Sequence, residues 1–170
     1  MLPTKILTKV ATIMTILIMS LNVQPALAAP SNANAANTTV AFQAAVNQSQ
    51  LISQACEDGV CAVVSQGFGA ANIMGPVSFT FDFVQDLNIT PCSPFSGVMT
   101  FEGESGTITF SHTGFVCLGS SPFGFPASIS SNWVITGGTG EFEGITGSGT
   151  SQGVIGGDGP IVHFSGTVLY

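Results

Sequence analysis

From Cys61 to the end of the chain, apolar and polar residues alternate with a period of two. This is the pattern of antiparallel strands that bury one face. Phe79, Phe81 and Phe83 share one face of such a segment, and Ile129 and Trp133 share one face of another. Broken by Gly and Pro, the pattern predicts short strands near 61–67, 77–85, 97–103, 107–116, 128–136, 145–151 and 160–170. Seven strands at this spacing indicate an all-β sandwich or barrel.

The segment before these strands has a weaker pattern. Residues 29–39 are small and polar, which suits a flexible leader. Val40, Ala44, Leu51 and Ala55 could share one face of a helix, and an early strand fits the same stretch. We therefore expect a flexible or partly helical segment at 29–55, followed by an antiparallel β-barrel domain at 56–170.

The first residues have the parts of a secretory signal. Lys5 and Lys9 precede an apolar run over residues 10–21, and Ala26-Leu27-Ala28 forms an A-x-A cleavage site. The run is shorter than the ~20 residues that a stable membrane span requires. These features predict a signal peptide at 1–28 and export to the periplasm or the extracellular space, with an uncleaved anchor as the alternative.

Cleavage there changes the charge of the chain. The chain has two Lys, Lys5 and Lys9, and no Arg, and both lie in the predicted signal peptide. The mature part therefore keeps nine acidic side chains, and its only basic side chains are two histidines. Nucleic-acid binding needs Lys or Arg against phosphates, and Arg clamps for anions and Schiff-base lysines are excluded as well. The partner of this acidic protein is expected to be neutral, apolar or cationic, or to be held by backbone N–H groups.

One hairpin can be placed in register. Two alternating runs flank a tight turn at 103–106. Centring the hairpin on this turn sets Phe101 opposite Ile108, so that apolar residues face apolar ones across the strands. The same register sets Cys92 opposite Cys117, within the Cα range of a disulfide.

The two remaining cysteines, Cys56 and Cys61, are then expected to form the second disulfide across a short loop. A Cys-x4-Cys spacing without a second close pair is a poor zinc signature, and it is not the redox spacing C-x-x-C. The sequence indicates no metal and no cofactor, and no G-x-S-x-G or H-E-x-x-H motif is present.

Residues 135–150 carry a glycine-rich segment, Ile-Thr-Gly-Gly-Thr-Gly-Glu-Phe-Glu-Gly-Ile-Thr-Gly-Ser-Gly-Thr. It resembles a segment shared by dirigent proteins, allene oxide cyclases and bacterial allene-oxide-cyclase-barrel-like proteins. The resemblance implies an eight-stranded, calycin-like antiparallel barrel. The glycines would allow a tight corner that Phe142 plugs. No catalytic residue of these families is carried over, because the chain has no Arg and no match to the cyclase substrate-binding set.

Few side chains are candidates for chemistry. His112 falls on the apolar face of its strand, as core or rim histidines do. His163 lies on the polar face of the last strand, where it could meet Asp82 or Glu102 inside a barrel as an acid–base pair. These three, Asp82, Glu102 and His163, are the predicted pocket residues.

Three function classes follow. The first is a non-enzymatic barrel that binds a neutral or apolar small molecule or a partner, or that has a structural role. The second is a cyclase- or isomerase-like enzyme that shapes its substrate inside the barrel. The third is a small outer-membrane barrel, which would carry aromatic girdles. We rank the binding or structural barrel first, because no catalytic motif is present.

Overall fold

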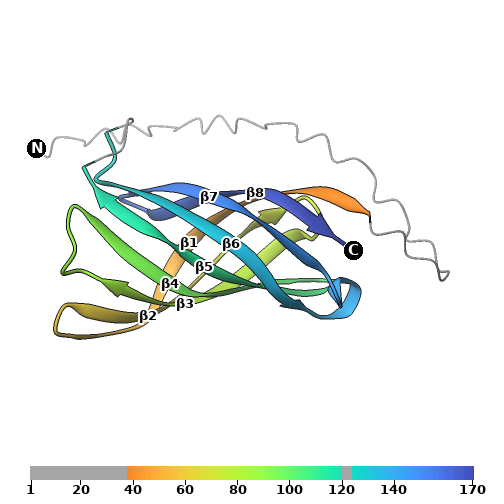
Figure 1. Ribbon diagram of the computed structural model, residues 1–170, viewed down its shortest axis with the longest axis horizontal. Helices are drawn as coiled ribbons and strands as arrows, with labels where there is room; N and C mark the ends of the chain where they lie inside the picture. The colour runs from red at the N-terminus through yellow and green to blue at the C-terminus, as the bar shows by residue number, and fades with distance from the viewer. Residues whose placement is uncertain (1–37, 120–123) are drawn as a thin grey trace, which may run out of the picture. The chain divides into compact units, whose positions relative to one another are not determined.

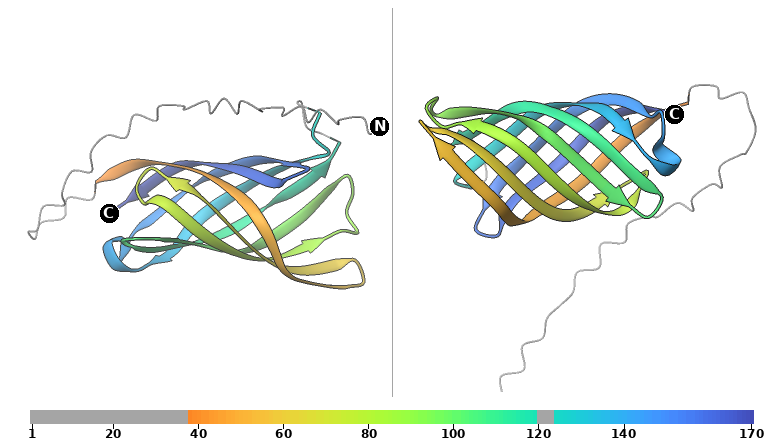
Figure 2. Two further views of the ribbon diagram at one scale, coloured as in Figure 1. Left: turned by 180° about the vertical axis from the view of Figure 1, so that it is seen from behind. Right: turned by 90° about the horizontal axis from the view of Figure 1, so that it is seen from below.

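The computed structural model describes residues 38–119 and 124–170, and it confirms the all-β class (Figure 1). Eight antiparallel strands follow one another around a closed barrel, each paired with its neighbours in sequence, and the last pairs with the first. The strands are β1 (Thr39–Glu57), β2 (Val60–Ala71), β3 (Gly75–Asp86), β4 (Cys92–Gly103), β5 (Gly106–Leu118), β6 (Ala127–Gly138), β7 (Thr146–Gly156) and β8 (Gly159–Leu169). They run obliquely around the barrel axis (Figure 2). A short 3-10 helix, η1 (Gly140–Phe142), connects β6 to β7.

β1 corrects the prediction for residues 40–55. This stretch is a strand and not a helix, because Phe42, Ala44 and Val46 alternate into the core with a period of two. β1 closes the barrel by pairing with β2 on one side and with β8 on the other. The barrel therefore starts at Thr39 and not at residue 56. The predicted signal peptide at 1–28 and the first part of the leader, to residue 37, lie outside the described residues.

The predicted hairpin and both disulfides are confirmed. β4 and β5 pair in the expected register, with Phe101 opposite Ile108 and Cys92 opposite Cys117. Disulfides join Cys92 to Cys117 and Cys56 to Cys61, over Cα–Cα distances of 4.0 and 4.1 Å. Both lie at the end of the barrel that carries the β1–β2 turn and the β3–β4 loop, which we call the disulfide end. The opposite end, which carries η1, is called the η1 end.

The η1 end is filled by side chains. Phe142 of η1 is 2% exposed and belongs to the core cluster, so the expected plug of the glycine-rich corner is confirmed. Gly140 and Gly144 on either side of it have φ angles of +65° and +80°, which favour glycine. Above the plug, aromatic rings pack edge to face, with centroid distances of 4.9 Å for Phe101–Phe110 and 5.3 Å for Phe42–Trp133.

Two glycines make room for the indole of Trp133. A Cβ atom at Gly149 of β7 or at Gly166 of β8 would clash with the Trp133 ring. These two glycines are direct cross-strand partners, so together they form a flat wall against which the ring lies. Trp133 is 1% exposed, and its indole N–H donates to the carbonyl oxygen of Thr150 at 3.0 Å. Within residues 38–119 and 124–170, no helix has the length and apolar character needed to cross a membrane.

Candidate functional site

The half of the barrel nearer the disulfide end is hollow. Its cavity has a volume of about 280 Å³ and is lined by inward-facing residues of all the strands except β2. The lining is mostly apolar, with five polar side chains: Gln48, Gln85, His112, Ser131 and Ser151. Gln48 and Gln85 are only partly buried, and with Ile155 and Pro160 they mark the mouth of the pocket. This end of the barrel therefore offers an interior pocket where the other end has a packed core.

Small residues on the inner face of the wall explain the hollow. Gly114 of β5, Ser131 of β6 and Ser151 of β7 are successive cross-strand partners, so they lie side by side across three strands. None of them has a side chain long enough to reach the barrel axis. At the same level, the rings of Phe95 and Phe164 continue the lining on the neighbouring strands. The pocket is the space that these small residues leave unfilled.

His112 is the only ionisable side chain in the pocket lining, and it is 2% exposed. Its ring packs edge-on against Phe81 and Phe164, with centroid distances of 5.5 Å to both. Burial lowers the pKa of His112 from 6.5 to about 4. The imidazole is therefore neutral near pH 7. The prediction that His112 lies on the same face as Ile108 and Phe110 is confirmed by the alternating burial of β5.

A short chain of hydrogen bonds starts at this histidine. The Nδ1 atom of His112 lies 3.3 Å from Oγ of Ser131, and Oγ of Ser131 lies 2.6 Å from Oγ of Ser151. Both serines are buried. The other ring nitrogen, Nε2, is buried without a hydrogen-bond partner among the described residues. No carboxylate belongs to this chain of groups, so it lacks the acidic member of a hydrolytic triad.

The three predicted pocket residues lie elsewhere. Asp82, Glu102 and His163 are exposed on the outer face of the barrel, and none of them lines the pocket. Asp82 of β3 is opposite Val98 of β4, and Ser78 of β3 is opposite Glu102 of β4. Asp82 and Glu102 are therefore offset by four positions along the paired strands. His163 is on β8, which β1 and β2 separate from β3. The expected acid–base pair inside the barrel is therefore not formed, because the apolar face of each strand points inward and the polar face outward.

Sequence reasoning missed Ser131 and Ser151. A signal for Ser131 was present, since it stands between Ile129 and Trp133 on the apolar face of its strand. A small hydroxyl residue at such a position is expected either to bond to another buried polar group or to face a cavity. Ser151 gave a weaker signal, because its strand is rich in Gly and Ser on both faces.

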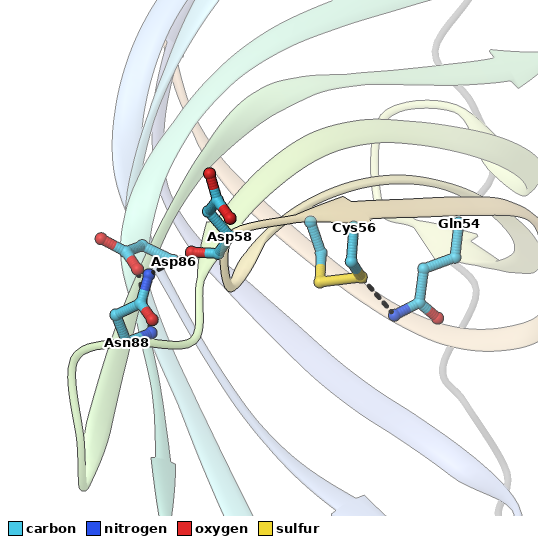
Figure 3. Close-up of a disulfide and its surroundings, with 6 residues drawn as sticks. Gln54, Cys56, Asp58, Asp86 and Asn88 are labelled. Atoms are coloured by element: carbon cyan, nitrogen blue, oxygen red, sulfur yellow. Dashed lines mark hydrogen bonds between the residues drawn. A yellow bond between two sulfur atoms is a disulfide. The ribbon is translucent and has the colours of Figure 1, made fainter.

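At the disulfide end, the β1–β2 turn is tied to the β3–β4 loop (Figure 3). The side-chain amide of Asn88, in the β3–β4 loop, donates to the backbone carbonyl of Asp58 at 2.7 Å. The backbone N–H of the same asparagine bonds to the Asp86 carboxylate at 2.9 Å. The Cys56–Cys61 disulfide lies close to these contacts in Figure 3. In the described part of the chain, no group of three or more His, Cys, Asp or Glu side chains could hold a metal ion.

A second hollow of about 540 Å³ lies over β4 to β7. Most of its lining consists of outward-facing residues, among them Phe115, Asn132 and Gln152, and it contains no ionisable side chain. It shares Phe95, Ser131 and Ser151 with the interior pocket, and the wall between the two is thin where the serines lie. Seven of its eleven lining residues are polar, whereas most residues of the interior pocket are apolar, so the interior pocket is the better candidate for a binding site.

A scan against protein-family models finds no match to the chain, and a search of curated proteins finds no match either. The resemblance of residues 135–150 to dirigent proteins and allene oxide cyclases therefore stays a prediction. The candidate site rests on the geometry of the barrel alone.

Proposed function

We propose that this barrel binds a small, neutral and mostly apolar molecule in its interior pocket. The observation that carries the proposal is the pocket lining, in which twelve of seventeen residues are apolar and none carries a charge near pH 7. Ligand sites typically combine an apolar lining with a few placed polar groups. His112, Ser131 and Ser151 would be those groups.

The volume of the pocket limits the size of the ligand. A dry protein cavity of about 150 Å³ accepts a benzene molecule. The 280 Å³ of this pocket corresponds to roughly two fused or linked rings. Because residues 29–170 contain no Lys or Arg, an anionic ligand would find no basic side chain to neutralise it.

The compartment is part of the proposal. Two disulfides in a small domain are compatible with an exported protein, because cysteines stay oxidised in the periplasm and outside the cell. With the predicted signal peptide, this supports a role in one of those compartments. The outward-facing positions of β5 to β7 are mainly Ser and Thr. A lipid-facing wall would be apolar, which favours interior binding over the outer-membrane alternative.

An isomerase-like activity is the second candidate. The observation that favours it is the contact between the neutral His112 and Ser131, since a neutral imidazole can accept a proton. The absence of a carboxylate from the pocket lining weakens this candidate, because no second group of the acid–base type is in place.

Methyl NMR tests the proposal directly. Naphthalene, a neutral molecule of suitable size, is titrated into the oxidised protein. We expect saturable shifts of the methyl groups of Val46 and Met99, which line the pocket. The methyl groups of Val98 and Val134, which are exposed on the outer face, should not move. Binding without a pocket shift, or no saturable binding, would contradict the proposal.

A matched pair of variants locates the site. Val162→Phe places a ring in the pocket and should weaken naphthalene binding at least tenfold. Ile161→Phe makes a similar change on the adjacent, outward-facing residue and should leave binding unchanged. Equal affinities of the two variants would place the ligand outside the pocket.

A further inference from the structure

The hollow over β4 to β7 is built from two neighbouring rows of outward-facing side chains. The row nearer the disulfide end consists of successive cross-strand partners on β5, β6 and β7, namely Phe115, Ser130 and Gln152. The next row consists of partners on the same three strands, namely Thr113, Asn132 and Thr150. All six side chains are exposed, so the hollow is open to solvent along this part of the outer wall.

Differences in side-chain length give the surface its concave shape. Ser130 stands between Phe115 and Gln152, so a short side chain lies between two long ones. The two rows are separated by roughly 7 Å along the strands, and three adjacent strands span roughly 10 Å. These dimensions are comparable to those of a pyranose ring with its hydroxyl groups. The volume of about 540 Å³ also lies in the range of small-molecule sites, ~300–1,000 Å³.

The polar part of the lining is neutral. Asn132 and Gln152 each offer an amide that can donate and accept, and the hydroxyl groups of the two rows can do the same. Within the described residues, neither amide has a hydrogen-bond partner, whereas the exposed amide of Gln66 donates to Gln50 at 2.7 Å. The chain has nine carboxylates, and none of them lines this hollow. The hollow therefore suits an uncharged molecule with several hydroxyl groups.

One side of the hollow is apolar. Phe115 is 49% exposed, and Pro94 of β4 is its direct cross-strand partner. An apolar face of a ligand would remove this surface from water, which is favourable. The electron-rich face of an aromatic ring also attracts polarised C–H groups. A sugar ring has both features, since C–H groups gather on its faces and hydroxyl groups project from its edge.

We propose that this hollow is a second binding site and that it takes a neutral saccharide. The C–H face of the sugar would lie against Phe115 and Pro94, and its hydroxyl groups would pair with the amides of Asn132 and Gln152. The inference goes beyond the proposed function, because the interior pocket is mainly apolar and takes a ligand of the opposite chemistry. Since the hollow is open to solvent, we expect dissociation constants in the millimolar range.

NMR titration of the ¹⁵N-labelled, oxidised protein tests the inference. The probes are the methyl glycosides of glucose, galactose, mannose and N-acetylglucosamine. At least one should give saturable shifts of the Asn132 and Gln152 side-chain amides, while the interior methyl groups of Val46 and Met99 do not move. Glycerol has hydroxyl groups but no ring face, so it should give no saturable shift. If no glycoside shifts these amides saturably, or if glycerol shifts them equally, the inference is overturned.

Two matched pairs of variants locate the site, with the tightest-binding of the four glycosides as the probe. Phe115→Ala should weaken binding about fivefold, while Phe68→Ala, which removes an exposed ring on β2, should leave it unchanged. Gln152→Ala should also weaken binding about fivefold, and Gln66→Ala on β2 is its control. All four side chains are exposed, and the methyl spectrum verifies that each variant is folded.

Equal affinities within either pair would place the saccharide outside the hollow and overturn the inference. The naphthalene titration is independent of this result, because it is observed at Val46 and Met99 in the interior. Failure of the saccharide to bind leaves the proposed function intact, and failure of naphthalene to bind leaves the saccharide site intact.

Discussion

Lowering the pH from 7 to 5 is expected to reduce the free energy of unfolding of the oxidised barrel by about 2 kcal/mol. The cause is His112, whose pKa is lowered by burial from 6.5 to about 4 in the folded protein. Between these two values the unfolded chain binds a proton that the folded chain does not. Stability is therefore fully present above pH 6.5 and falls as the pH is lowered towards 4.

The size of the effect follows from the width of this window. A difference of about 2.5 pKa units corresponds to about 3 kcal/mol once the pH is below both values. At pH 5 the unfolded state is almost fully protonated at this residue and the folded state is not, so about 2 kcal/mol of the loss has already appeared. No charged side chain lines the pocket around His112 to offset the cost of protonation there.

Denaturant unfolding at pH 7, 6 and 5, with the disulfides intact, measures this slope. His112→Gln should flatten the slope, while His163→Gln, which alters the exposed histidine on the outer face, should retain it. Equal slopes in wild-type protein and His112→Gln would show that burial of this histidine is not the cause. A wild-type stability that is the same at pH 7 and pH 5 would refute the reasoning altogether.

Three further changes test the packing and the covalent links, each by denaturant unfolding. Gly166→Ala places a methyl group against the ring of Trp133 and should destabilise the fold by about 1–3 kcal/mol. Phe142→Ala removes the plug of the η1 end and should cost about 3–5 kcal/mol. Replacing Cys92 and Cys117 by Ser opens a link across a sequence separation of 25 and should cost about 3 kcal/mol in the chain-entropy model.

Each of these changes has a control in the same chain. A methyl group at Gly157 meets no atom within 4 Å, and Glu141, next to the plug, is exposed. Gly157→Ala and Glu141→Ala should therefore shift stability by less than about 0.5 kcal/mol. The Cys56–Cys61 link spans a separation of only 5, so its removal should cost about 2 kcal/mol. A larger loss for the shorter link would contradict the entropic argument.

The sequence was most informative where residues pair locally. The hairpin around 103–106 fixes its own register, and the Cys92–Cys117 disulfide follows from it. β1 was harder to predict, because it closes the barrel through a partner, β8, more than 100 residues away in sequence. Its alternation of Phe42, Ala44 and Val46 is short and is followed by two irregularities.

The pocket shows a different limit of sequence reasoning. A period of two separates the faces of a strand, but it does not say which face lines the inside of a barrel. Placing Asp82, Glu102 and His163 inside treated the polar face as the lumen, as in a porin. The two faces of each strand differ enough for burial of the apolar one to decide the direction. Once the apolar face is assigned to the interior, Ser131 and Ser151 are recognised as polar residues on that buried face.

The two irregularities in β1 affect how readily copies of the protein can associate through a strand edge. Within the described residues, β1 pairs with β8 only as far as Asn47. Residues 48–57 pair with β2 on one side, and their other edge has no partner strand. The register shifts between Gln48 and Gln50 and between Leu51 and Ser53 fall in this overhang. Bulges interrupt the regular spacing of hydrogen-bonding groups that an incoming strand needs. A chain rich in strands would in this way be kept from joining copies of itself edge to edge.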